Sequence, residues 1–144
     1  MELKDLKVGD WVLYKESPAK VSEINSDKLV VQRKDNYKSV VNLSDLCPLS
    51  ITEGSLRENK GIVIDNYQGN IEIAINIMLN DDYDGNYLRL YQKAGVKTWL
   101  VSLCTRAASG SWVDNVKHLH TIRYVNELQH ILWALGNNDN LQIN

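Results

Sequence analysis

The sequence has little cysteine, no long apolar run and no excess of either charge, and each shortage excludes a class of protein. Its two cysteines, Cys47 and Cys104, lie far apart among apolar neighbours and form no CxxC pair, so we expect two reduced, buried thiols. No apolar run approaches the about 20 residues that a membrane helix needs. Residues 1–5 lack the apolar segment of a signal peptide. We therefore expect a cytoplasmic protein that makes no membrane contact.

The charges are balanced, which bears on nucleic-acid binding. Lys and Arg total 16, Asp and Glu total 18, and the net charge of the 144 residues is -2. Proteins dedicated to duplex nucleic acid usually carry a strong basic excess, because phosphate contacts supply most of their affinity. The balance disfavours broad nucleic-acid binding and is compatible with a small basic patch.

The first fifty residues predict a small β domain. Alternating or apolar segments separated by turn residues indicate strands at 11–14, 20–24, 28–32 and 37–43. Ser17-Pro18 is expected to break the first of these runs, and a one-turn helix is expected at 42–46. Pro48 marks the exit because proline cannot continue a strand ladder. Strands this short bury an apolar face best by curling, so 1–50 is predicted to form an SH3-like β-barrel.

Residues 51–61 predict a short joining helix with Thr52 as its N-cap and Gly61 at its end. Beyond it, strands return. The clearest alternation is at 71–79, where isoleucines and Leu79 share one face. Asp84-Gly85 indicates a hairpin leading to a strand at 87–91. Further strands are predicted at 98–104 and from Trp112.

A closing helix is predicted from about 121 to 135. Its apolar stripe has helical spacing and consists of Tyr124, Val125, Leu128, Ile131, Leu132 and Leu135. Thr121 is its expected N-cap and Gly136 its C′ residue, and the polar tail from Asn137 is expected to fray. Residues 62–144 are thus predicted to form an antiparallel sheet packed by this helix. The whole chain is predicted to be α+β and mainly β.

Three segments together resemble a family of short, uncharacterised phage and prophage proteins of intestinal anaerobic bacteria. They are the Val8-Gly9-Asp10-Trp11-Val12 opening, the Pro48–Thr52 join, and the closing Tyr124–Gln129 segment followed by Ala134-Leu135-Gly136. Family members typically end in a "YVHxLQxLYFAL-G" helix. This chain has Asn126 where the family often has His, and His130-Ile131-Leu132-Trp133 replaces the usual "NLYF". The resemblance implies an architecture and a genomic setting, and no chemistry.

Two groups of residues have a weak resemblance to metal sites. His118 and His120 would share a face if 115–120 is a strand, while Glu127 and His130 share a helix face. A zinc site needs three or four such groups to converge, and nothing in the sequence brings the two faces together. The segment from Asn80 to Gly85 imitates a calcium loop, but Tyr91 stands where a bidentate Glu is needed. We therefore predict no metal and no cofactor.

No sequence motif indicates catalysis, so we predict that the chain is not an enzyme. Cys104 ends an apolar strand, where burial makes a thiol inert. The predicted function is a protein-binding adaptor module of phage or mobile-element origin. The alternative is single-stranded nucleic-acid binding by a basic-aromatic face of the barrel, for which the candidate residues are Trp11, Tyr14, Arg33, Lys34 and Tyr37. Against that alternative, Trp11 is interpreted as a core residue, and the lysines as protection of a β edge.

Overall fold

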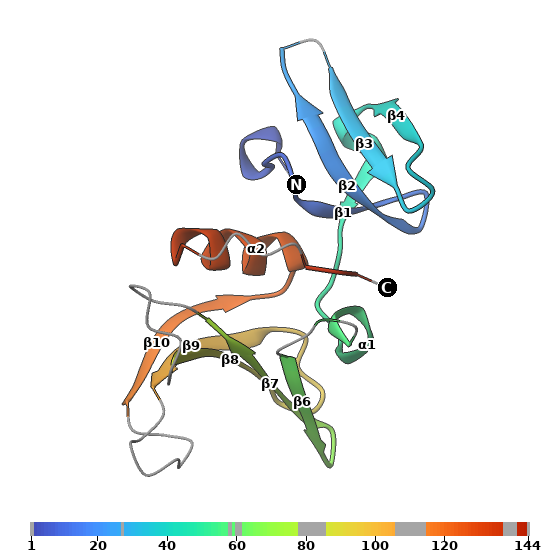
Figure 1. Cartoon of the computed structure of the whole chain (residues 1–144). Helices are drawn as coiled ribbons and strands as arrows, with labels where there is room; N and C mark the ends of the chain where they lie inside the picture. The colour runs from blue at the N-terminus through green and yellow to red at the C-terminus, as the bar shows by residue number, and fades with distance from the viewer. Residues whose placement is uncertain are drawn as a thin grey trace.

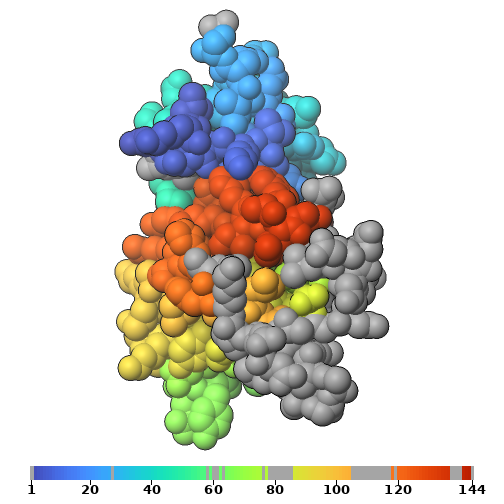
Figure 2. Space-filling model, turned by 90° about the vertical axis from the view of Figure 1, so that its left-hand side faces the viewer, coloured from blue at the N-terminus to red at the C-terminus, as the bar shows by residue number. Residues whose placement is uncertain are grey.

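The computed structural model contains two five-stranded antiparallel sheets with one long helix, α2, between them (Figure 1). It describes residues 2–26, 28–57, 59, 62–77, 86–105, 115–136 and 141–143. On the face shown in Figure 2, the first residues of the chain (blue) lie directly against α2 (red), and the second sheet lies on the other side of the helix. The predicted α+β, mainly β class is confirmed.

The first sheet has the strand order β4-β3-β2-β1-β5. Its strands are β1 (Trp11–Tyr14), β2 (Ser17–Ile24), β3 (Leu29–Arg33), β4 (Lys38–Val41) and β5 (Leu46–Pro48), with 3-10 helices η1 (Leu3–Asp5) and η2 (Leu43–Asp45). Alternate side chains form its core: Leu6, Val12, Tyr14, Ala19, Val21, Leu29, Val31, Val41 and Leu46. The four predicted strands and the one-turn helix before Pro48 are therefore confirmed, whereas β5, in which Pro48 pairs with Val12, was not predicted.

Three details of the first sheet differ from the prediction. Pro18 lies inside β2 opposite Leu13, because the turn is made by Lys15 and Glu16, whose φ angles are 48° and 63°. Cys47 is exposed, because β5 turns it away from the buried Leu46. Among the described residues no ladder joins β4 to β5, so the predicted closed barrel is not observed. Both edge strands are short, which limits their unpaired backbone.

A single helical turn connects the two sheets. Helix α1 (Glu53–Leu56) is shorter than the predicted 51–61. Thr52 is its N-cap as predicted, since its hydroxyl oxygen accepts a hydrogen bond from the Ser55 N–H at 3.0 Å. The predicted stop at Gly61 lies outside the described residues.

The second sheet is a meander with the order β10-β9-β8-β7-β6. Its strands are β6 (Ile62–Tyr67), β7 (Asn70–Asn76), β8 (Asn86–Gln92), β9 (Trp99–Thr105) and β10 (Asn115–Ile122). The predicted alternation is confirmed, because Ile73, Ile75 and Ile77 are buried on one face. Leu79, the Asp84-Gly85 hairpin and the strand predicted from Trp112 lie outside the described residues.

Helix α2 (Val125–Ala134) buries Val125, Leu128 and Leu132 against the second sheet. It begins later than predicted, because β10 continues through Thr121 to Ile122. The N-cap position is Tyr124, whose N–H donates to Glu127 Oε1 at 3.1 Å. Gly136, with φ +81°, ends the helix as predicted. No helix in the described part of the chain is long and apolar enough to cross a membrane.

Residues 141–143 return to the core, so the predicted frayed tail is wrong for this segment. Leu141 and Ile143 are buried in the same apolar cluster as α2 and the second sheet. Between them, the Gln142 N–H donates to Asn59 Oδ1, and Asn59 Nδ2 donates to the Gln142 carbonyl, both at 2.7 Å. The burial of these two apolar side chains and the two hydrogen bonds to Asn59 hold this segment in place.

Candidate functional site

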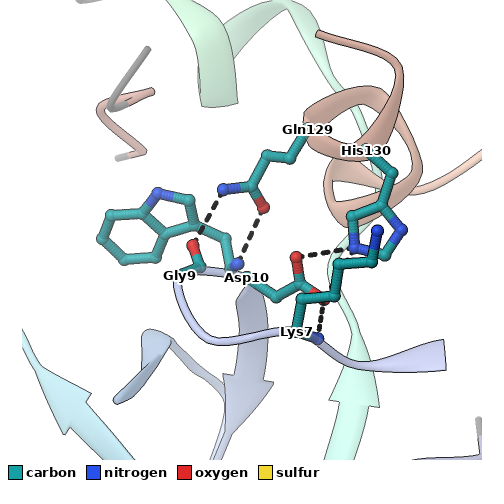
Figure 3. Close-up of polar contacts among 6 residues, drawn as sticks. Lys7, Gly9, Asp10, Gln129 and His130 are labelled. Atoms are coloured by element: carbon teal, nitrogen blue, oxygen red, sulfur yellow. Dashed lines mark hydrogen bonds and ion pairs between the residues drawn. The ribbon is translucent and has the colours of Figure 1, made fainter. Parts of the chain in front are cut away.

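A buried polar network joins the start of β1 to α2 (Figure 3). The Trp11 N–H donates to Gln129 Oε1 at 2.8 Å, and Gln129 Nε2 donates to the Gly9 carbonyl at 2.9 Å. The Gln129 side chain thus pairs with the backbone as a neighbouring strand would. Because Gln129 is only 2% exposed and the Trp11 N–H is buried, the Gln129 oxygen is the partner that water cannot supply to this N–H.

An Asp-His pair lies next to this network. The His130 Nε2 atom is 2.8 Å from Asp10 Oδ1 and 3.0 Å from Oδ2, and the Lys7 N–H donates to Oδ2 at 2.8 Å. Asp10 is fully buried, and this burial raises the pKa of its carboxyl, against the opposing effects of the Lys7 N–H and His130. The pair holds α2 against the first sheet.

The residues considered as metal ligands do not converge. His118 and His120 lie on β10, where both are exposed and a β-bulge separates them. Glu127 accepts hydrogen bonds from the Arg123 and Tyr124 N–H groups, and His130 is paired with Asp10. In the described part of the chain, no three potential metal ligands form a group.

The basic and aromatic residues proposed from the sequence do meet in part. Trp11, Arg33 and Lys34 line a cavity of about 470 Å³ between the first sheet and residues 141–143. We call it the basic cavity. Its remaining lining residues are Lys20, Gln32, Asn36, Gln142 and Ile143. The position of Lys20 follows from strand register, because Trp11 pairs with Lys20 and Lys20 pairs with Gln32.

Of the three aromatic candidates, Trp11 lines this cavity, whereas Tyr14 and Tyr37 do not. Trp11 is in the core, as the sequence analysis predicted. Its Nε1–H donates to the Leu141 carbonyl at 2.7 Å. Tyr14 is buried in the first sheet, whereas Tyr37 is 65% exposed. The Arg33 guanidinium lies between these two tyrosines, 5.8 Å from the Tyr14 centroid and 5.9 Å from the Tyr37 centroid.

The basic cavity is positively charged. Lys20, Arg33 and Lys34 line it, and no carboxylate does. Among the described residues none of these three cations forms an ion pair. The Arg33 Nε atom is buried without a hydrogen-bond partner, although it is a donor. An anion with oxygen acceptors in this cavity would neutralise the three cations.

Tyr87 and Cys104 form a second buried titratable pair, on the strands β8 and β9. They face each other across the ladder, and burial raises the pKa of both. The pKa of Tyr87 reaches about 12, with a further contribution from its hydrogen bond to Cys104. Cys104 is therefore an unreactive core thiol, as predicted from its apolar strand.

This shift predicts a loss of stability in alkali. Above the ordinary tyrosine pKa of 10.0 the unfolded chain releases the Tyr87 proton, while the folded chain retains it until about pH 12. Stability contributed by this group is thus complete below pH 10.0 and lost as the pH rises to about 12, by about 2–3 kcal/mol. Urea unfolding at about pH 9 and about pH 11.5 measures it.

Two variants isolate this effect. Tyr87→Phe should remove the part of the alkaline loss due to Tyr87, about 2–3 kcal/mol, and leave the part due to Cys104, whose pKa is also raised, whereas Tyr67→Phe, at a 72% exposed position, should leave both intact. A parallel decline in the wild type and Tyr87→Phe would contradict the assignment.

A comparison of the chain with protein-family models, with curated proteins and with solved structures finds no match. We therefore infer the function from the geometry of the basic cavity.

Proposed function

We propose that this protein is a non-enzymatic binding module whose basic cavity holds a single-stranded nucleic acid. The observation that carries the proposal is the gathering of Lys20, Arg33 and Lys34 around one cavity with no carboxylate in its lining. Phosphate oxygens are the acceptors that this set of donors fits best. The volume of the basic cavity, about 470 Å³, is in the range of small-ligand sites.

A single strand fits better than a duplex because its bases are free to stack. Tyr37 is exposed beside Arg33, so its ring is available to a base while Arg33 holds the neighbouring phosphate. Because the overall charge is -2, the electrostatic attraction for phosphate comes from this local patch and not from the protein as a whole. We therefore propose modest affinity and a short site.

We also propose that the module has an SH3-like first sheet and a phage or mobile-element origin. A one-turn helix, η2, precedes the last strand β5, and both support an SH3-like first sheet. Binding in place of catalysis is supported by the structural contacts of three titratable groups: the buried Asp10 pairs with the half-buried His130, and the buried Cys104 forms a hydrogen bond with Tyr87. The proposed origin is supported by the three sequence segments that resemble phage and prophage proteins.

A direct test is fluorescence anisotropy with a labelled single-stranded oligonucleotide. Binding at about 50 mM salt should weaken steeply by about 200 mM, as expected when phosphate contacts release counterions. The double variant Arg33→Ala/Lys34→Ala should weaken binding about tenfold or more and flatten the salt dependence.

The matched control is Lys93→Ala/Lys97→Ala, which instead removes two exposed cations from the loop between β8 and β9. It should retain wild-type affinity. Absence of binding at low salt, or an equal loss in both double variants, would reject the nucleic-acid proposal.

A protein partner is the second candidate, and one feature of β4 favours it. This strand lies at the edge of the first sheet, and Val40 on it is 65% exposed, as is the preceding Tyr37. An exposed edge strand is a template for a strand of another protein. Binding of that kind would be insensitive to salt and to the charge of Lys34, which distinguishes it from the first proposal.

A further inference from the structure

A row of three polar side chains continues from the basic cavity across the first sheet. Lys20 on β2 pairs with Gln32 on β3, and Gln32 pairs with Lys38 on β4. Residues directly opposite each other in an antiparallel sheet project from the same face, so all three lie on one face. This is the face of the basic cavity, because Lys20 and Gln32 line it. We call the three residues the lysine row.

The row begins at Trp11, inside the proposed binding site. Trp11 pairs with Lys20 in the strand register, and the Lys20 ammonium group lies 5.4 Å from the centre of the Trp11 ring. This cation–π contact holds Lys20 at the cavity, where Trp11 is also a lining residue. From Lys20 the row leads outward over β3 to the edge of the sheet.

Lys38 lies at that edge, beyond the lining of the basic cavity. Its side chain is exposed, and among the described residues it forms no ion pair. A lysine ammonium is a compact point charge with three donors, and without a carboxylate beside it this group is available to a phosphate.

The carboxylates in this part of the first sheet do not pair with the row. Glu23 Oε1 accepts a hydrogen bond from Asn25 Nδ2 at 2.7 Å, and Asp35 Oδ1 accepts one from the Tyr37 N–H at 3.0 Å. In the described part of the chain, neither carboxylate forms an ion pair with Lys20 or Lys38. The positive charge of the row is therefore not cancelled by a direct partner.

The spacing of the two lysines suits successive phosphates of one strand. Neighbouring strands of a sheet lie about 4.8 Å apart, so the backbones of Lys20 and Lys38 are separated by about 10 Å. This separation lets each lysine contact a phosphate of its own. Between them lies the uncharged Gln32, whose amide donates to Asn36 Oδ1 at 3.1 Å and places no negative charge on the path.

We propose that Lys38 is a further phosphate-binding residue, and that the single strand runs from the basic cavity along the lysine row to β4. This inference rests on the proposed function and adds the direction in which the strand crosses the sheet. Because lysine contacts the phosphate and not a base edge, Lys38 should strengthen the binding of every sequence by a similar factor.

The test is fluorescence anisotropy with a labelled thymidine hexanucleotide. Lys38→Gln removes the charge and should weaken binding about threefold to tenfold. The slope of log affinity against log salt concentration should become shallower by about 0.7, the value for one phosphate contact to a single strand. Lys38→Arg keeps the charge and should bind as the wild type does, which separates a phosphate contact from a change in the fold of β4.

The matched control is Lys28→Gln, which removes one exposed cation from the opposite end of β3. It should retain wild-type affinity and salt dependence. An equal loss in Lys28→Gln and Lys38→Gln would mean that binding responds only to the total charge of the first sheet, and it would overturn the path along the row.

Failure of this inference is distinguishable from failure of the proposed function. If Lys38→Gln binds like the wild type while Arg33→Ala/Lys34→Ala binds more weakly, the strand does not reach β4 and the inference is overturned, although the proposed function stands. Self-association of Lys38→Gln with unchanged oligonucleotide affinity, measured by sedimentation, would show that Lys38 only protects the β4 edge and would overturn it too. Absence of hexanucleotide binding by the wild type would reject both proposals.

Discussion

Replacing Gln129 with leucine should destabilise the folded protein by about 1–4 kcal/mol. The leucine leaves the buried Trp11 N–H without a partner and removes one hydrogen bond from the half-buried Gly9 carbonyl. The unsatisfied Trp11 N–H costs about 1–3 kcal/mol because it is buried, and the lost bond to Gly9 adds up to about 1 kcal/mol. Urea unfolding followed by circular dichroism measures the change in the free energy of unfolding.

The control for this variant is Gln68→Leu, which makes the same chemical change at an exposed turn of the second sheet. It should alter stability by less than about 0.5 kcal/mol. Equal effects of the two substitutions would mean that Gln129 contributes nothing specific to the joining of β1 and α2.

Replacing Trp11 with alanine should have an effect of similar size, about 3–5 kcal/mol. Trp11 belongs to β1 of the first sheet, but its ring is buried in the apolar cluster of α2 and the second sheet. Its loss leaves a cavity between the two sheets and removes the donor to the Leu141 carbonyl. Thermal and urea unfolding both report this cost.

Trp11→Phe separates the two contributions to this cost. It keeps most of the ring volume and loses the Nε1–H, so it should cost about 1–3 kcal/mol. Hydrogen exchange at the Gln142 amide should accelerate in both variants, since residues 141–143 lose an anchor. If Trp11→Ala unfolds at the wild-type urea concentration, the ring is not part of the core.

The sequence predicted most strands because each needs only a local period-two pattern. The alternation at Ile73 and Ile75 marks β7 without reference to any other strand. Boundaries were less predictable. Lys15 and Glu16 form a two-residue turn with positive φ, a turn that usually contains Asn or Gly, so Pro18 was wrongly expected to break the strand. Thr121 was similarly taken for a helix cap, although it pairs with Leu100 in the sheet.

The candidate sites were predictable only in part. Arg33 and Lys34 were identified because basic residues near aromatic ones form a local pattern, whereas Lys20 required the register of β1 and β2. Gln142 and Ile143 were missed because three residues are too few to show a periodic pattern.

The amino-acid order alone determined the two β regions, the final helix and its apolar stripe, because these depend on hydrophobic periodicity between near neighbours. Tertiary structure alone decided how they are joined, through Gln129 on Gly9 and Trp11 on Leu141. The partners in these two contacts are 120 and 130 positions apart. A periodic pattern indicates that a side chain is buried, but not which distant polar group pairs with it, and the basic cavity forms only when Trp11 and residues 141–143 come together.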